Sequence, residues 1–175
     1  TNIKKTMPKD LLAIPKPRLG YVGCICHRLD FNLIFRLAQK NPHWSIVFVG
    51  PISLDSSEDK MTNSIKYINQ LKTLANVFFL GQKIKSRVPN YLDHFDLCLI
   101  PYNIREDFNK YCYPMKIFEY FCRSKPVVST PIKSLLPLQP YVQIAKDAKE
   151  FNEKITNILK NGWSKEYRTK QKELA

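Results

Sequence analysis

The sequence predicts an α/β fold in which a doubly wound, parallel sheet of six strands carries helices on both faces. Short apolar runs alternate with segments of helical periodicity, which is the pattern of such a sheet. The runs are nearly continuous in Val, Ile, Leu and Phe, as expected for strands buried on both sides. The expected strands are 19–25, 45–50, 76–81, 96–101, 126–130 and 141–145.

Helices are predicted between these strands. Asp30 is expected to cap a helix that stops at Asn41 and Pro42. The other expected helices are 64–74, 87–95, 115–122 and 147–161, with an irregular crossing over 131–140. Glycine or proline follows several strands at the carboxyl end, where an open parallel sheet binds its ligands.

The length favours one domain, because 175 residues with 44% hydrophobic content suffice for a single covered core. Residues 1–17 are rich in Lys and Pro and are expected to be an interdomain linker. We expect a Rossmann-like domain over 18–161 and a truncated, polar helical tail over 162–175.

The net charge of +13 indicates a surface that attracts phosphate, nucleic acid or anionic lipid, without deciding among them. The basic residues are spread along the chain, so a solvated basic surface explains them as well as a membrane-facing one. No apolar run reaches the roughly eighteen residues of a spanning helix. We expect a cytoplasmic protein and leave open a peripheral contact with the anionic inner face of a membrane.

The five cysteines form an odd set and lack the paired spacings of zinc sites or disulfide frameworks. One residue separates Cys24 from Cys26, too few for the Cys-x-x-Cys redox motif. The cysteines are expected to be reduced core thiols, and no metal site is predicted.

Several ordered segments resemble the carboxyl-terminal, donor-binding domain of GT-B fold glycosyltransferases of family 4, also called group 1. The main one is PMKIFEY at 114–120, followed by KPVV at 125–128. The others are YVG at 21–23, FVGP at 48–51, NVFFLGQK at 76–83, HFD at 94–96 and PY at 101–102. The resemblance covers 18–158 and implies one half of a GT-B fold. It also implies a hexosyltransferase that uses a UDP or GDP sugar in polysaccharide or glycolipid biosynthesis.

The resemblance implies a nucleotide-diphosphate-sugar site around the PMKIFEY segment. Glu119 lies one turn into the expected helix, where its carboxylate accepts both ribose hydroxyls in the family. Tyr113, Pro114 and Met115 form the turn whose backbone amides face the diphosphate. Lys116 is a candidate phosphate ligand, although an ordinary helix-surface pair with Glu119 explains it equally well.

Further binding residues are implied at the ends of three strands. Gly23 lets the backbone approach the sugar or diphosphate. Gly81, Gln82 and Lys83 form the loop under the base, where Gln82 has either a specific role or that of a surface turn residue. Tyr102 follows the fourth strand and belongs to the expected site.

Two departures from the family pattern are visible. The family commonly has an arginine directly after the glycine at 23 and a lysine a few residues later, but the segment 24–28 reads CICHR. Arg28 is the nearby guanidinium, and either the diphosphate or Asp30 is its expected partner. The first of the family's paired glutamates is Tyr111 here. No catalytic residue is assigned beyond Arg28 and Lys116 as candidates for stabilising the leaving diphosphate.

The implied reaction is transfer of a sugar to an acceptor hydroxyl, with retention and without a metal or other cofactor, the nucleotide sugar being a substrate. The family's acceptor site lies on an amino-terminal domain, which is an expected partner and is absent from this chain. The chain alone is expected to bind nucleotide but not to transfer sugar. Two alternatives remain: an inactive nucleotide-binding domain of the same fold, and a basic nucleic-acid-binding module. The preferred interpretation involves no nucleic acid.

Overall fold

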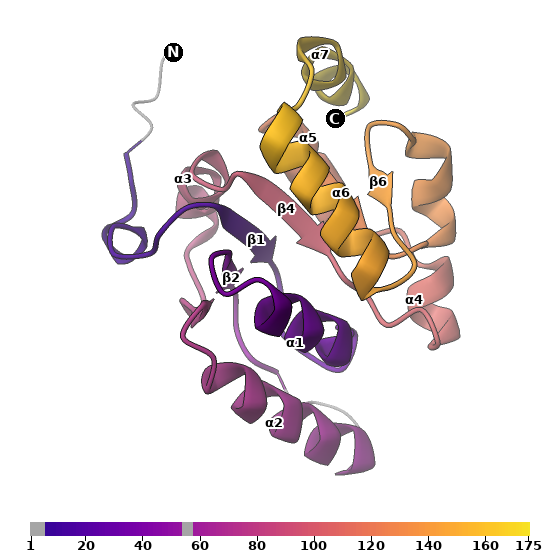
Figure 1. Cartoon of the computed structure of the whole chain (residues 1–175). Helices are drawn as coiled ribbons and strands as arrows, with labels where there is room; N and C mark the ends of the chain where they lie inside the picture. Colours follow the sequence, from indigo (N-terminus) through magenta and orange to yellow (C-terminus); the bar gives the residue numbers. More distant parts are fainter. Residues whose placement is uncertain (1–5, 54–57) are drawn as a thin grey trace.

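A computed structural model describes residues 6–53 and 58–175 and confirms the doubly wound α/β fold (Figure 1). Six strands form one parallel sheet in the order β3-β2-β1-β4-β5-β6. They are β1 (Arg18–Val22), β2 (Ser45–Val49), β3 (Val77–Phe79), β4 (Leu97–Ile100), β5 (Val127–Ser129) and β6 (Gln143–Ile144). Every residue of β1, β2, β4 and β5 is buried, as the continuous apolar runs predict.

Helices cover both faces of the sheet. They are α1 (Phe31–Lys40), α2 (Glu58–Lys72), α3 (Val88–Asp93), α4 (Asp107–Tyr111), α5 (Lys116–Cys122), α6 (Ala148–Asn161) and α7 (Lys165–Leu174). Short 3-10 turns are η1 (Lys9–Leu11), η2 (Lys85–Arg87) and η3 (Lys133–Leu138). Helix α1 contacts α2 and α6 on one side of the sheet, whereas α5 packs against α7 on the other (Figure 1). No helix in the described part of the chain is long and apolar enough to cross a membrane.

The structure extends and corrects several predicted elements. Helix α2 starts at Glu58 rather than at 64, because polar residues without an apolar stripe form its first turns. Helix α4 was not predicted, since its five residues are too few to show a period. The strand expected over 19–25 ends at Val22, because the next residue, Gly23, takes φ +140° and turns the chain out of the extended conformation. Ile25 keeps only an isolated bridge to Ile52.

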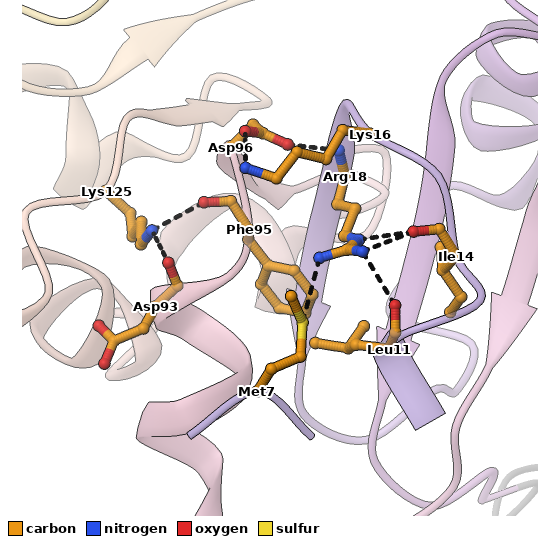
Figure 2. Close-up of polar contacts among 9 residues, drawn as sticks. All are labelled: Met7, Leu11, Ile14, Lys16, Arg18, Asp93, Phe95, Asp96 and Lys125. Atoms are coloured by element: carbon orange, nitrogen blue, oxygen red, sulfur yellow. Dashed lines mark hydrogen bonds and ion pairs between the residues drawn. The ribbon is translucent and has the colours of Figure 1, made fainter. Parts of the chain in front are cut away.

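Part of the predicted linker packs against the sheet. Arg18 is 5% exposed, and its guanidinium donates to the carbonyl oxygens of Leu11 (2.9 Å) and Ile14 (2.6 and 2.9 Å), as Figure 2 shows. Leu11 and Ile14 belong to the core. The Asp96 carboxylate accepts from the Arg18 backbone N–H at 2.7 Å. A linker role for 1–17 stays a prediction, and residues 1–5 lie outside the described residues.

The lysine of the KPVV segment has a structural role. Its ammonium donates to the carbonyl oxygens of Asp93 (2.8 Å) and Phe95 (2.7 Å), which end and follow α3 (Figure 2). A cation at these carbonyls also complements the negative end of the helix dipole. Lys125 therefore fixes the end of α3 to the start of β5.

All five cysteines are free thiols, in agreement with the sequence. Only Cys26 and Cys98 are buried, whereas Cys24 and Cys122 are exposed, so the expected core position is wrong for those two. Burial raises the pKa of Cys98 to about 12, which keeps it a neutral thiol.

Gly20 is required in β1 by the ring of Phe95. A Cβ at this position would lie 2.0 Å from Cδ2 of that buried ring. We expect Gly20→Ala to lower the free energy of unfolding, measured with denaturant, by about 1–3 kcal/mol through overpacking. Phe95→Leu should restore part of this loss in the double variant. If the losses of unfolding free energy from Gly20→Ala and Phe95→Leu simply add in the double variant, the contact between position 20 and the Phe95 ring is not the cause.

Arg18 is expected to hold residues 7–14 on the sheet. Arg18→Met leaves the Ile14 carbonyl without a donor and the Leu11 carbonyl with the Ile14 N–H alone, and it should cost about 1–3 kcal/mol of unfolding free energy. Hydrogen exchange should accelerate at the amides of 11–14. Arg36→Met on the exposed side of α1 is the matched control. Unchanged exchange in Arg18→Met would contradict this role.

Candidate functional site

The loops that follow β1, β2 and β3 touch through their backbones at the carboxyl edge of the sheet. The Gly23 N–H donates to the carbonyl of Val49 (2.9 Å), and the Gly50 N–H donates to the carbonyl of Gly81 (3.0 Å). Gly50 has φ +152°, and a Cβ there would lie 2.0 Å from the Gly23 carbonyl oxygen. Only glycine at position 50 permits this contact.

Lys116 extends from the start of α5 to this edge. Its ammonium donates to the hydroxyl of Tyr102 and lies 4.8 Å from the ring centres of both Tyr21 and Tyr102. A Cβ at Gly23 would lie 3.2 Å from the Lys116 Nζ. The lysine therefore occupies the space above Gly23 that a side chain would fill.

The groups around Lys116 are neutral. Burial raises the pKa of Tyr21 well above its ordinary value, and the neighbouring Tyr102 and Tyr120 raise it further. Burial likewise raises the pKa of Tyr120, whose hydroxyl accepts from the Val22 N–H at 3.0 Å. Lys116 forms no ion pair with any described residue, so the helix-surface pair with Glu119, which the sequence allowed, is not formed. Its positive charge is held by hydroxyl and ring groups and is not cancelled.

Arg28 lies beside the same tyrosine. Its guanidinium carbon is 4.9 Å from the ring centre of Tyr102 and 4.8 Å from that of Phe108. Its Nε donates to the Asn109 Oδ1 at 3.0 Å. The Asp30 carboxylate instead accepts from the Leu33 N–H (2.9 Å) as the predicted cap of α1, and it forms no ion pair with Arg28. Tyr102 thus contacts both predicted cations.

The remaining residues of the predicted turn lie at the start of α5. Tyr113 is exposed and its ring stacks on Phe118 at 5.7 Å. Pro114 is buried, and its carbonyl accepts from the Ile117 N–H at 3.0 Å. Met115 occupies the N-cap position with its side chain exposed, and Glu119 is exposed in the first turn.

The predicted base loop is divided between two environments. Gly81 receives the hydrogen bond from Gly50, and Gln82 is exposed. The Lys83 ammonium instead lies 2.8 Å from the carboxylate of Asp10, which also accepts from the Tyr91 hydroxyl. Burial alone would raise the pKa of Asp10, but the hydrogen bonds from Lys83 and Tyr91 outweigh it and hold that pKa below its ordinary value. Lys83 is engaged with the segment before β1, and its role in binding stays a prediction.

Three residues that contact Lys116 or Arg28 were not predicted as site residues. Tyr21 lies in a strand whose apolar neighbours indicate a core residue. Phe108 and Asn109 lie in a polar stretch after β4 in which no period marks either side chain. Asn109 is 1% exposed, and burial of a polar residue follows from tertiary contacts that no local pattern shows. In the part of the chain that the structure describes, no group of three His, Cys, Asp or Glu is placed to hold a metal.

Solved structures share this fold. Sucrose-phosphate synthase from Thermosynechococcus elongatus matches with a TM-score of 0.73 and 19% identity over 99% of this chain and 45% of its own. Anabaena Alr3699/HepE in complex with UDP-glucose matches with a TM-score of 0.65 and 16% identity over 90% of this chain and 42% of its own. The C-terminal domain of a glycosyl transferase group 1 family protein (LpcC) from Francisella tularensis matches with a TM-score of 0.61 and 13% identity, over 87% of this chain and 78% of its own. These identities establish the fold alone.

Sequence comparison gives the family. TuaH of Bacillus subtilis (strain 168), provisionally named a teichuronic acid biosynthesis glycosyltransferase, is 34% identical over 125 residues. The match covers 71% of this chain and 29% of that protein. The family model "Glycosyl transferases group 1" matches residues 17–161, which include every strand of the sheet and the Gly23, Arg28, Tyr102 and Lys116 cluster. The chain belongs to the group 1 glycosyltransferases.

Proposed function

We propose that this chain is the donor-binding domain of a retaining glycosyltransferase, which binds a nucleotide-diphosphate sugar and uses no metal or other cofactor. The observation that carries this proposal is the placement of Lys116, held by the neutral Tyr21 and Tyr102 directly above the backbone of Gly23. Arg28 lies against the same Tyr102 ring. Fixed, uncancelled cations at the carboxyl edge of a parallel sheet suit a diphosphate.

The chemistry follows from the charge that develops during transfer. Departure of the nucleotide diphosphate from the anomeric carbon builds negative charge on its oxygens. Lys116 and Arg28 stabilise this charge without reorganisation, because the aromatic rings and Asn109 already hold them in place. The amides of Ile117 and Phe118 serve the turn itself, so those of Met115 and Lys116 are the donors proposed for the diphosphate.

The rest of the donor is assigned to the neighbouring loops. Glu119, exposed in the first turn of α5, accepts hydrogen bonds from the ribose hydroxyls. Tyr113 and Pro114 shape the turn, and the loop of Gly81, Gln82 and Lys83 receives the base. Anabaena Alr3699/HepE, which shares the fold, is in complex with UDP-glucose, in keeping with a UDP or GDP sugar as the donor. The similarity to TuaH supports a polysaccharide acceptor.

The acceptor belongs to another part of the protein. The chain spans 29% of the length of TuaH and less than half of the sucrose-phosphate synthase chain. We assign the acceptor hydroxyl to an amino-terminal domain that closes on the edge formed by Gly23, Tyr102 and Lys116. On this proposal the present chain binds the nucleotide, and transfer of the sugar requires both domains.

We also propose that the protein is cytoplasmic and contacts an anionic membrane peripherally, and helix α7 supports this contact. Lys165, Arg168 and Lys172 share one side of the helix and line, with Arg123 directly after α5, an open cavity of about 470 Å³. Lys165 and Lys172 are exposed and form no ion pair with another described residue. Their charge is available to lipid phosphates.

Calorimetric titration with UDP, GDP, ADP and inorganic pyrophosphate tests the donor site. Lys116→Met should weaken UDP and pyrophosphate alike, by roughly 10- to 100-fold, because a charge-assisted hydrogen bond is lost. Glu119→Ala should weaken UDP but leave pyrophosphate unchanged, since pyrophosphate has no ribose.

Lys165→Met, at a distant exposed lysine, is the control for loss of charge. Equal UDP affinity in wild type and Lys116→Met would refute the site. Tight, salt-steep binding of short DNA or RNA without nucleotide preference would favour the nucleic-acid alternative.

Sedimentation with vesicles tests the membrane contact. The double variant Lys165→Glu/Lys172→Glu should bind vesicles rich in phosphatidylglycerol at least tenfold less than wild type, as roughly 1 kcal/mol is expected per lysine near the surface. Lys40→Glu/Lys72→Glu makes the same change in net charge on exposed residues of α1 and α2. An equal loss in both double variants would show that only the net charge matters.

A further inference from the structure

Helix α4 is held by a buried asparagine instead of an apolar face. Asn109 is the only buried residue among the five of Asp107–Tyr111, and it is 1% exposed. Phe108 and Tyr111, the large apolar side chains of the same helix, are 72% and 63% exposed. A buried amide at the centre of a short helix needs hydrogen-bond partners.

The Asn109 amide bonds to both the side chain and the backbone of Arg28, and to the backbone of Asn103. Its Oδ1 accepts from the Arg28 Nε at 3.0 Å, and its Nδ2 donates to the Arg28 carbonyl oxygen at 3.3 Å. The same Nδ2 donates to the Asn103 carbonyl at 3.0 Å. The amide of Asn109 is therefore fully used in fixing Arg28 to the loop after β4.

The backbone around Arg28 is tied to the same loop. The Asn103 N–H donates to the Arg28 carbonyl (2.8 Å), and the Asp30 N–H donates to the Pro101 carbonyl (2.8 Å). Leu29 also forms an isolated antiparallel bridge with Tyr102. Arg28 is consequently anchored on both sides along the chain.

The environment of the guanidinium selects which of its nitrogens remain for a ligand. The rings of Tyr102 and Phe108 lie at 4.9 and 4.8 Å from its central carbon, and Nε is bonded to Asn109. No ion pair involves Arg28 within 6–53 and 58–175. The two terminal nitrogens are the donors that remain, and their parallel N–H groups match two oxygens of a phosphate.

We propose that Asn109, with Phe108, is a positioning residue that aims the terminal nitrogens of Arg28 at one phosphate group of the bound nucleotide diphosphate. This inference rests on the proposed donor site and adds the residues that orient its second cation. Asn109 does not touch the nucleotide and acts through Arg28. Phe108 covers the guanidinium and restricts its rotation.

A double-mutant cycle tests the inference by calorimetric titration with UDP and pyrophosphate. Arg28→Gln should weaken both ligands by about 10- to 100-fold, and Asn109→Ala by about three- to tenfold. In the Arg28→Gln background, Asn109→Ala should cause no further loss, because its effect passes through Arg28. Asn32→Ala, an exposed asparagine of α1, should leave both affinities unchanged. An equal loss from Asn109→Ala in both backgrounds would show a merely structural role and overturn the inference.

Two further variants keep the test open if Asn109→Ala does not fold. Asn109→Asp preserves size and the acceptor for Nε but places a carboxylate beside Arg28, so it should weaken UDP at least as much as Asn109→Ala. Phe108→Ala removes an exposed ring and should weaken UDP about two- to fivefold, again only when Arg28 is present. Unchanged affinity in both would overturn the inference.

The outcome separates this inference from the donor site itself. UDP binding that depends on Lys116 but not on Arg28 keeps the donor site and refutes the role of Asn109. Absence of UDP and pyrophosphate binding in the wild type refutes both.

Discussion

The backbone contact between Gly23 and Gly50 is the constraint on which the rest of the site depends. A side chain at position 50 would collide with the Gly23 carbonyl, and the loops after β1 and β2 would separate. Their contact aligns the first three strand ends through hydrogen bonds to Val49 and Gly81. It also leaves Gly23 as a flat backbone surface, which the Lys116 ammonium covers. Two glycines in the sheet loops thereby determine where a cation from a helix distant in sequence comes to lie.

The large positive charge of the chain divides into cations with structural partners and cations held by neutral groups. Arg18 and Lys125 donate hydrogen bonds to backbone carbonyls, and Lys83 forms an ion pair with the carboxylate of Asp10. Lys116 and Arg28 instead lie against aromatic rings, and neither forms an ion pair with a carboxylate of the described residues. A neutral shell keeps the positive potential intact for a ligand, whereas a carboxylate would cancel most of it. The partners of a cation, more than the net charge of +13, therefore distinguish the edge that we propose for donor binding.

The fold was predictable because its strands are buried on both faces and stand out as apolar runs. The resemblance of their segments to a family assigns Glu119, Lys116 and Gly23 to the donor site, and the structure places the Lys116 ammonium near Gly23, while their binding roles stay predictions. The pairing of Lys83 with Asp10 and the burial of Asn109 were not, since each joins residues far apart in the chain and leaves no local period. The packing of Leu11 and Ile14 was hidden for a similar reason. The apolar run 11–14 is too short to show a period and lies in a Lys- and Pro-rich segment, so its place in the core is seen only from its packing and from the bonds of the Arg18 guanidinium to the Leu11 and Ile14 carbonyls.

The departures from the family pattern and the contacts of the cluster explain one another. The loop after β1 lacks cations at the positions next to Gly23, where Cys24 and Cys26 stand instead. The structure brings the Lys116 ammonium of α5 to Gly23, and Arg28, later in the same loop, lies against the ring of Tyr102. Both contact the ring of Tyr102, which follows β4, so the carboxyl end of the neighbouring strand takes over the support of the cations. A side chain held on a helix or by a buried amide loses less freedom on binding than one in an open loop. On the proposed donor site, Lys116 and Arg28 thus supply the positive charge that the altered loop lacks next to Gly23.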